Sequence, residues 1–571
     1  MDRKTIVLVV LLVVVLIFYF PIMEFLGLYK PAPPEPQESQ PPADTTTQVV
    51  RPESVPTEAP PTAAIGADTA VVEAPVEEEF VRPDTIVVET NKYLVTLTTA
   101  GGGPVSMKLK EYDYRNDVKI EMMPEAVVAT PELSFAGGQF TTSTVNFTCD
   151  RDPRAYDATR DQLDITYAYQ PAAGGKIVRH FRFYPDEYHY ELFVEVIGPG
   201  ELGFDRQYYL VWNTPLGVTE PQPKIDYDAM QAVAMQAGSR ESLDDFDDGK
   251  LDQSLTGNTT WAGIRSKYFA AVMIPTNRHA ESVFAQGEKR SIDTRDGEVE
   301  QRLITVGMEM PFTAMTTSFA DSFTVFVGPL DYLLMADYNV GLEDMLDIGT
   351  APFVGWIIKP FAIAIIWLLP KMYDVIPNYG LVIILFALLV KLITMPLSMK
   401  SFKSMNAMKE LQPKIEELKK RHKNNPQAMN QEMMKLYKQH GVNPLSGCLP
   451  ILPQMPLLFA MFSVFRSTIL LRDAPFVWFI ADLSHGATGL TDPYIIMVVI
   501  MIVAQFVSQK FTMASTQQNK ALLYIMPLFM GFIFYSLSAG LILYWTCFSV
   551  FSLIDYFAFK RRKNSEVKTA K

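Results

Sequence analysis

The chain has 571 residues, of which 49% are hydrophobic, so it is long enough for several domains. Two of its three cysteines (Cys149, Cys448 and Cys547) lie in apolar segments, which excludes a disulfide framework. The chain has 50 Lys/Arg and 63 Asp/Glu. Residues 351–571 contain 23 of the Lys/Arg and 10 of the Asp/Glu, which gives this part a net charge of +13. The remaining residues, 1–350, therefore have a net charge of −26. Such asymmetry indicates two compartments or two partners.

The N-terminal segment is predicted to be a membrane anchor followed by a tether. Residues 6–20 form an unbroken apolar run after Arg3 and Lys4. A cleaved signal peptide is the alternative, but no small-x-small cleavage site follows closely. We therefore expect an uncleaved anchor over residues 1–28, with its N-terminus in the cytoplasm. Residues 29–84 are rich in Pro, Glu, Thr and Ala, which predicts a disordered tether.

Residues 85–340 are predicted to form a soluble β-sandwich. The sequence TIVVETNKYLVTLTT alternates in the manner of strands, and the GGG at 101–103 predicts a turn. Residues 176–196 read as two strands around Pro185 and Asp186, and 268–275 and 323–329 as further strands. Many short strands separated by turn residues favour a sandwich.

This soluble part offers no clear metal or catalytic site. His180, His189 and His279 lack metal-ligand spacing. The acidic run DDFDD at 244–248 could bind calcium, but it lacks the glycine and glutamate spacing of an EF-hand loop. A solvated acidic loop is the favoured interpretation.

Residues 379–396 (YGLVIILFALLVKLITMP) are predicted to be a membrane span, placed within 376–398, that carries one charge, Lys391. An ionisable residue at membrane depth is costly and indicates a functional site. The alternative is a lysine whose ammonium reaches the lipid headgroups while its stem stays buried.

Residues 399–443 are predicted to form a cytoplasmic hairpin of two helices, broken at Asn424, Asn425 and Pro426. Ten Lys/Arg against four Glu over 399–440 place it in the cytoplasm. Its apolar residues at helical spacing would pack the two helices of the hairpin against each other. The additional methionines would also suit a soft surface for varied apolar partners.

Four further spans are expected at 444–470, 493–509, 521–538 and 540–559. A periplasmic loop (471–492), a cytoplasmic loop (510–520) and a basic cytoplasmic tail (560–571) complete the C-terminal part. If the N-terminus is cytoplasmic, the number of membrane crossings leaves the hairpin and the tail in the cytoplasm only when residues 353–369 do not cross the membrane. We therefore expect an interfacial amphipathic helix within 341–375, with Trp356 and Trp367 as anchors.

Several polar residues share one predicted depth near the cytoplasmic side. They are Lys391, Gln454, Gln505, Ser508, Gln509, Ser549, Ser552 and Asp555. Pro450, Pro453 and Pro456 remove backbone donors, which membranes tolerate only where protein or a wet cavity satisfies the freed carbonyls. Together they indicate a wet cavity open to the cytoplasm. Single hydrogen bonds between helices are the alternative for any one glutamine.

Several motifs make the sequence similar to a known family. They are ETNKYLVTLTTAGGGPVSMKLKEY, FVGPLDY, MPLSMKSFKSMNAMKELQPKIEELKKRH, QEMMKLYKQHGVNPLSGCLPILPQMPLLFAMF, APFVWFIADLS and GLILYW. The chain resembles the YidC/Oxa/Alb membrane protein insertases, in the Gram-negative YidC form with a large periplasmic domain. The resemblance covers most of the chain except the tether.

The resemblance implies a multi-pass α-helical membrane protein of the bacterial inner membrane. An N-terminal anchor and five core helices would carry a periplasmic β-supersandwich and a cytoplasmic hairpin. It implies a substrate groove that includes Gln454, Tyr544 and Trp545, with Lys391 where relatives have arginine and Ala387 where some have threonine. We add Gln505 and Gln509 to this groove from their depth.

The implied function is insertion and chaperoning of nascent membrane proteins, with or without the Sec translocon. The ribosome and the lipid bilayer are further expected partners, DNA is not, and no catalytic residue, cofactor or metal is expected. Hairpin contacts are expected from Met405, Met408, Lys409, Lys419, Lys420 and Arg421. The alternatives are a sugar-active periplasmic enzyme on a membrane anchor, which needs a convergent carboxylate pair, and a polytopic transporter, which would show inverted repeats.

Overall fold

The computed structural model describes residues 84–569 apart from 116, 125, 127–128, 173, 205, 295–296, 313–315, 349–354, 423–424, 442–450, 490 and 513–516. The predicted anchor, and the predicted tether up to residue 83, lie outside the described residues. Two compact units are present: residues 415–440 belong to one, and the rest of the described chain belongs to the other.

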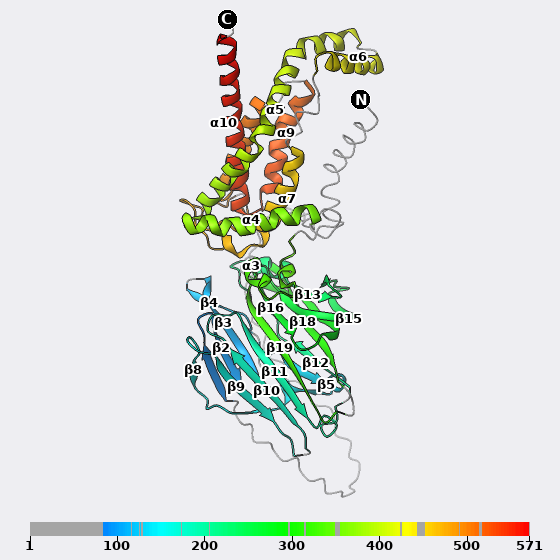
Figure 1. Ribbon diagram of the computed structural model, residues 1–571, viewed down its shortest axis with the longest axis vertical. Helices are drawn as coiled ribbons and strands as arrows, with labels where there is room; N and C mark the ends of the chain where they lie inside the picture. Colours follow the sequence, from blue (N-terminus) through cyan, green and yellow to red (C-terminus); the bar gives the residue numbers. More distant parts are fainter. Residues whose placement is uncertain are drawn as a thin grey trace, which may run out of the picture. The chain divides into compact units, whose positions relative to one another are not determined.

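The sheet-rich domain consists of two β-sheets (Figure 1). The five-stranded sheet has the order β4-β3-β2-β1-β8 and contains β1 (Thr85–Glu89), β2 (Tyr93–Thr98), β3 (Gly103–Arg115), β4 (Val118–Glu121) and β8 (Ala155–Asp157). The other sheet has 14 strands. They are β5 (Glu132–Phe135), β6 (Phe140–Thr141), β7 (Thr148–Cys149), β9 (Leu163–Tyr169), β10 (Lys176–Phe183), β11 (His189–Ile197), β12 (Gln207–Trp212), β13 (Gln231–Gln236), β14 (Ser239–Leu243), β15 (Lys250–Arg265), β16 (Phe269–Pro275), β17 (Ala280–Thr294), β18 (Gly297–Pro311) and β19 (Ser318–Pro329).

Period-two burial explains why these segments are strands. Every second residue of β10 is buried, including Ile177, Phe181 and Phe183, and β10 pairs antiparallel with β11 from Lys176↔Ile197 to Phe183↔Tyr190. These are the two strands expected around Pro185. Gly102 lies in the expected glycine turn with φ +63°, and a Cβ there would lie 2.6 Å from the Phe147 ring.

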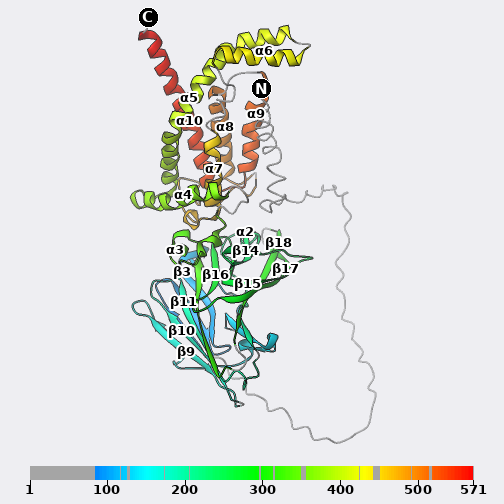
Figure 2. The same ribbon diagram turned by 45° about the vertical axis from the view of Figure 1, so that its right-hand side comes forward.

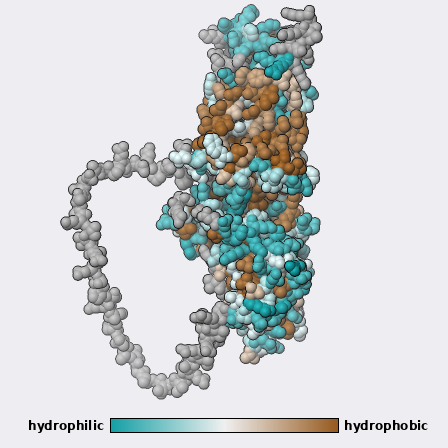
Figure 3. Space-filling view, turned by 90° about the vertical axis from the view of Figure 1, so that its left-hand side faces the viewer, coloured by the Kyte–Doolittle hydropathy of each residue, from teal (hydrophilic) through white to brown (hydrophobic). Residues whose placement is uncertain are grey.

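The α-helices of the described chain are α2 (Pro223–Ala229), α3 (Tyr332–Ala336), α4 (Gly355–Val375), α5 (Tyr379–Arg421), α6 (Pro426–Gln439), α7 (Ile451–Ser467), α8 (Ile495–Thr512), α9 (Gln517–Phe534) and α10 (Ala539–Thr569). Within the described residues, α4, α5, α8 and α10 are long and apolar enough to cross a membrane, and Leu523–Phe534 of α9 is a shorter apolar helix. On the face shown in Figure 3, apolar side chains gather in a band over the core helices, whereas polar side chains predominate on the sheet domain. The chain is thus a multi-pass helical membrane protein with a sheet-rich domain.

Helix α4 corresponds to the segment expected at the membrane interface. Its length and composition would allow a span, yet it runs crosswise to α7 and packs against it (Figures 1 and 2). Trp356 and Trp367 are exposed on α4, as interfacial anchors would be. The interfacial placement of α4 stays a prediction.

Helix α5 differs from the expected organisation, because the predicted span and the first hairpin helix are one continuous helix of 43 residues. Ser398, the polar residue nearest the expected boundary, donates to the Thr394 carbonyl at 3.2 Å and so does not cap a new helix. The helix also continues through Pro396 and Pro413. Helix α10 likewise runs on to Thr569, into the segment expected to be a basic tail.

The unit of residues 415–440 holds the end of α5 and helix α6. The break expected at Asn424–Pro426 lies between them, since α5 ends at Arg421 and α6 begins at Pro426. Asn425 caps α6 by accepting from the Ala428 amide at 3.1 Å, and Pro426 occupies the first turn, where its missing donor costs nothing.

A buried ion pair joins the sheet domain to the loop after α7. Arg472 Nε lies 2.6 Å from Glu220 Oε1, and both side chains are at most 3% exposed. The guanidinium also donates to the carbonyls of Asp113 and Thr219, at 2.8 and 3.0 Å. Burial raises the pKa of the Glu220 carboxyl to about 7, despite the opposing effect of Arg472.

Candidate groove in the core helices

Lys391 is held on the inward face of α5. The neighbouring Ala387 and Val390 are buried, whereas Leu392 and Ile393 are exposed on the other side of the helix. The Lys391 side chain is only 5% exposed. Its ammonium therefore points into the protein rather than toward the lipid headgroups, in contrast to the alternative of a snorkelling lysine.

The partners of the Lys391 ammonium come from α10. Lys391 Nζ lies 3.3 Å from Asp555 Oδ2 and donates to Ser552 Oγ at 3.0 Å. It also lies 4.9 Å from the centre of the Phe548 ring, within the range of a cation–π contact. Asp555 and Ser552 belong to the polar set expected at this depth, but the direct pairing was not predicted.

A second polar contact joins α8 to α10. Trp545 Nε1 donates to Gln505 Oε1 at 3.3 Å, and Gln505 is buried. Ser549 donates to the Trp545 carbonyl at 2.9 Å, so its hydroxyl proton is bonded within α10. Helices α8 and α10 pack along one another, which brings Gln505 and Trp545 together as part of one polar region.

Gln509 and Ser508 follow Gln505 on α8, and both lie near its cytoplasmic end in the expected topology. Ser508 is buried, and its carbonyl accepts from the Thr512 hydroxyl at 2.7 Å. Gln509 Oε1 is buried without a hydrogen-bond partner among the described residues. An unpaired buried oxygen of this kind needs a water or another polar group, which fits a hydrated region.

The remaining expected groove residues are placed differently. Tyr544 is 1% exposed and packs between Phe386 and Phe548, with ring centres 6.0 Å apart in each case. It contributes packing behind Phe548 rather than an exposed surface. Gln454 is half-buried on α7, and no hydrogen bond joins it to Lys391 or Gln505 in the described chain.

The three prolines differ in their effect on α7, whose described part begins at Ile451. Pro453 lies in the first helical turn, where the backbone N–H has no helical partner in any case. Of the two prolines within the helix, only Pro456 lies beyond the first turn and leaves a helical carbonyl without its partner. Pro450 lies outside the described residues.

The expected hairpin contacts have different surroundings. Lys409 donates to the Phe511 carbonyl at 3.2 Å and lies 5.6 Å from the Tyr556 ring centre, so it is engaged within the core. Arg421 is exposed and pairs with Glu417 at 2.7 Å. Met405, Met408 and Lys419 are half-buried, and Lys420 is exposed.

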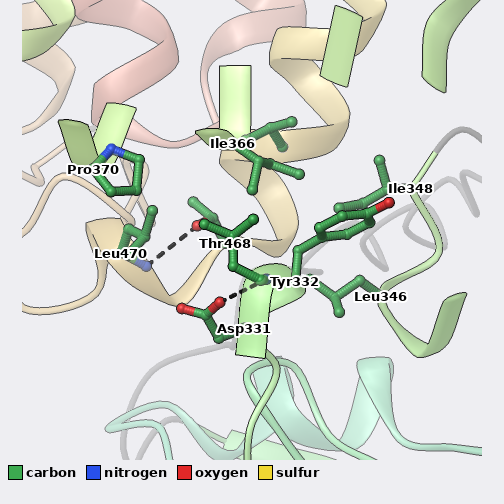
Figure 4. Close-up of a pocket in the computed structure, with 10 residues that line it drawn as sticks. Asp331, Tyr332, Leu346, Ile348, Ile366, Pro370, Thr468 and Leu470 are labelled. Atoms are coloured by element: carbon green, nitrogen blue, oxygen red, sulfur yellow. Dashed lines mark hydrogen bonds between the residues drawn. The ribbon is translucent and has the colours of Figure 1, made fainter. Parts of the chain in front are cut away.

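Two other places differ from the groove. A pocket lined by side chains of α3, α4, α7 and the segments that follow α3 and α7 (Figure 4) has a volume of about 20 Å³, which holds about one water. The acidic run at 244–248 lies in a turn before β15, where Asp245, Asp247 and Asp248 are exposed. No group of three or more His, Cys, Asp or Glu is arranged to hold a metal in the part of the chain that the structure describes.

Comparison with known proteins gives two family matches. Residues 371–566 match the family described as 60Kd inner membrane protein, and residues 85–364 match the YidC periplasmic domain. The membrane protein insertase YidC of Chlorobium limicola is 32% identical over 587 residues, which cover 98% of this chain and 94% of that protein.

Two solved structures show a weaker likeness. An active YidC insertase crystal structure with the first transmembrane domain resolved is 20% identical, covers 82% of this chain and 91% of its own, and has a TM-score of 0.36. A putative aldose 1-epimerase from Escherichia coli K12 is 9% identical, covers 43% and 99%, and has a TM-score of 0.27. Both scores are too low to carry a conclusion about this chain.

Proposed function

Because the chain belongs to the YidC family of membrane protein insertases and is a membrane protein insertase of the inner membrane, we propose that the polar region formed by Lys391, Gln505, Gln509, Trp545, Ser552 and Asp555 is its substrate groove. The carrying observation is the buried ammonium of Lys391, held by α10 inside an otherwise apolar set of helices. Ionisable groups at such depth are kept for function.

The groove would lower the cost of bringing a polar tail into the membrane. A charged or polar tail loses its hydration in hydrocarbon, at a cost of several kcal/mol per unsatisfied group. Buried hydrogen-bonding groups and an ammonium replace part of that hydration. For an acidic tail the membrane potential adds about 2.3 kcal/mol per charge per 100 mV.

The apolar segment behind the tail would leave along the lipid-facing side of α5. Leu388, Leu392 and Ile393 are exposed there. They give a nascent span an apolar surface beside the groove, so it reaches lipid without crossing a polar region. Burial of apolar surface would supply about 25 cal/mol per Å², and the sequence contains no phosphate-binding GxxxxGK[ST] motif that would indicate nucleotide hydrolysis.

We place the groove toward the cytoplasm and the sheet domain in the periplasm. The basic hairpin supports this orientation. Lys420 and Arg421 are exposed at the end of α5, and they suit polyanionic ribosomal RNA or anionic headgroups equally. The Sec translocon is a further proposed partner. A sugar-active enzyme is not favoured, since relatives that share both parts of the chain are named insertases.

Photo-crosslinking from positions 391 and 505 to a stalled ribosome–nascent chain with one new membrane segment tests the groove. Position 532 on α9, an exposed apolar residue, serves as the matched control. We expect the polar tail to crosslink at 391 and 505 and not at 532. Tail crosslinks at 532 alone would refute the groove.

A further inference from the structure

Asp555 is the only carboxylate paired with Lys391 among the described residues, and it lies within the apolar part of α10. Its side chain is 14% exposed, and that of Lys391 is 5% exposed. The stretch Ala539–Arg561 is apolar enough to cross a membrane. An aspartate buried there is as costly as the lysine, so the two charges must be considered together.

Among the described residues, one face of α10 supplies the polar, ionic and aromatic contacts of the ammonium. Phe548, Ser552 and Asp555 follow at spacings of four and three residues, which aligns them on one side of a helix. Ser552 donates its own proton to the Phe548 carbonyl at 2.8 Å, so its oxygen is free to accept from Lys391. This face therefore forms a cradle for one cation.

Asp555 is held in this cradle loosely. Its distance of 3.3 Å from Lys391 exceeds the roughly 2.7–2.9 Å of a charge-assisted hydrogen bond. Oδ2 has no hydrogen-bond partner in the described chain. The Arg472–Glu220 pair is different, since its 2.6 Å contact is supported by two backbone carbonyls on the guanidinium. Asp555 thus balances the charge of Lys391 without being fixed by hydrogen bonds.

A neutral pair does not attract an acidic tail over distance. The ammonium has donors enough to contact a second carboxylate, but two carboxylates against one cation would leave a net negative charge buried. The incoming carboxylate and Asp555 therefore compete for the charge of Lys391. We propose that Asp555 is a resident counter-ion that acidic residues of the substrate displace, and that it determines how strongly the insertase prefers acidic tails. This role rests on the groove function proposed above.

The competition predicts opposite effects for two substitutions at one position. Asp555→Asn removes the competitor and leaves a cation without its partner, so acidic tails gain relative to neutral ones. Asp555→Glu lengthens the side chain by one methylene, which allows its carboxylate to close the 3.3 Å gap to Lys391, so acidic tails lose. A merely structural Asp555 would impair acidic and neutral tails alike in both variants.

The test uses the full chain in lipid vesicles and one single-span substrate whose tail carries either two Asp or two Asn. Insertion is measured by protease protection, as the ratio of acidic to neutral tails. We expect Asp555→Asn to raise the ratio about tenfold and Asp555→Glu to lower it. Asp374→Asn is the control, since it removes an exposed carboxylate from α4 and should leave the ratio unchanged.

An unchanged ratio in both Asp555 variants would overturn the counter-ion role, as would a fall in both. If Asp555→Asn does not fold, Asp555→Glu still decides, because a resident competitor requires its ratio to fall below that of the natural chain. Failure of the groove itself would look different: chains with the natural Asp555 and a photo-crosslinker at 391 or 505 would then give no tail crosslinks.

Discussion

At the level of single residues, Lys391 and Asp555 are each unfavourable in a membrane and become tolerable as a pair. Breaking a buried pair leaves an uncompensated charge and costs about 3–5 kcal/mol, whereas replacing both partners with apolar residues is often neutral. Stability and function can therefore be separated at this site.

We predict that Lys391→Ala destabilises the chain by about 3–5 kcal/mol, because Asp555 is left buried without its cation. The double variant Lys391→Met/Asp555→Leu should recover most of this loss yet insert acidic tails poorly, since the cation is absent. Thermal unfolding in detergent and insertion into vesicles measure the two effects.

Lys391→Arg is the matched control for charge. It keeps a cation near Asp555 and should retain insertion of both kinds of tail, although the guanidinium is planar and offers more donors. Normal insertion of acidic tails by the double apolar variant would contradict a role for the cation.

At the level of helices and strands, the hydrophobic periodicity of the sequence predicted the elements better than the boundaries between them. The strands β10 and β11 could be predicted, because one face of each is buried and the alternation is visible in the sequence. The continuity of α5 could not, because Pro396 usually marks a boundary and only the structure shows Ser398 bonded back to Thr394 rather than capping a helix.

The site itself was partly predictable. The rule that intramembrane charges are functional identifies both Lys391 and Asp555. Their contact is not visible in the sequence, since Lys391 and its partner Ser552 are 161 residues apart. The Gln505–Trp545 bond depends in the same way on how α8 and α10 pack.

The loop after α7 carries a pH-sensitive contact with the sheet domain. Burial raises the pKa of Glu220 from 4.5 to about 7, so the folded chain binds a proton there that the unfolded chain releases above about pH 4.5. The hydrogen bond between His485 and Asp482 raises the pKa of His485 above 6.5, so the folded state again favours the protonated form. Both groups therefore lower the free energy of unfolding as pH rises.

We predict that Glu220 lowers the unfolding free energy of the full chain between pH 5 and pH 8, against the opposite effect of His189, whose pKa burial lowers, and that Glu220→Gln reduces the resulting fall by about 1–3 kcal/mol. The glutamine cannot ionise, so its burial costs the same at both pH values. Denaturant unfolding in detergent at the two pH values measures the effect, with exposed Glu300→Gln on β18 as the control. An equal fall in the natural chain and in Glu220→Gln would contradict this account.

For the whole molecule, the charge distribution predicts which side of the membrane each part faces. Residues 1–350 are strongly acidic and residues 351–571 are basic. The basic excess follows the positive-inside tendency if the hairpin is cytoplasmic and the sheet domain periplasmic. This orientation is open to a direct chemical test.

We predict that a membrane-impermeant maleimide labels Asp293→Cys on β17 in intact spheroplasts and labels Lys420→Cys on α5 only after the membrane is opened. Both positions are exposed, so access alone decides the result. The background carries Ser at 149, 448 and 547. Labelling of Lys420→Cys in intact spheroplasts would reverse the proposed topology.

The ion pair between Arg472 and Glu220 also sets an order for the protein's own biogenesis. The partners are 252 residues apart, which at about 5–20 residues per second separates their synthesis by about 13–50 s. The last strand, β19, ends at Pro329, so both sheets are complete in the chain long before Arg472 is made. The sheet domain is therefore complete while Glu220 still lacks its cation, and the contact forms only after the loop following α7 has been made.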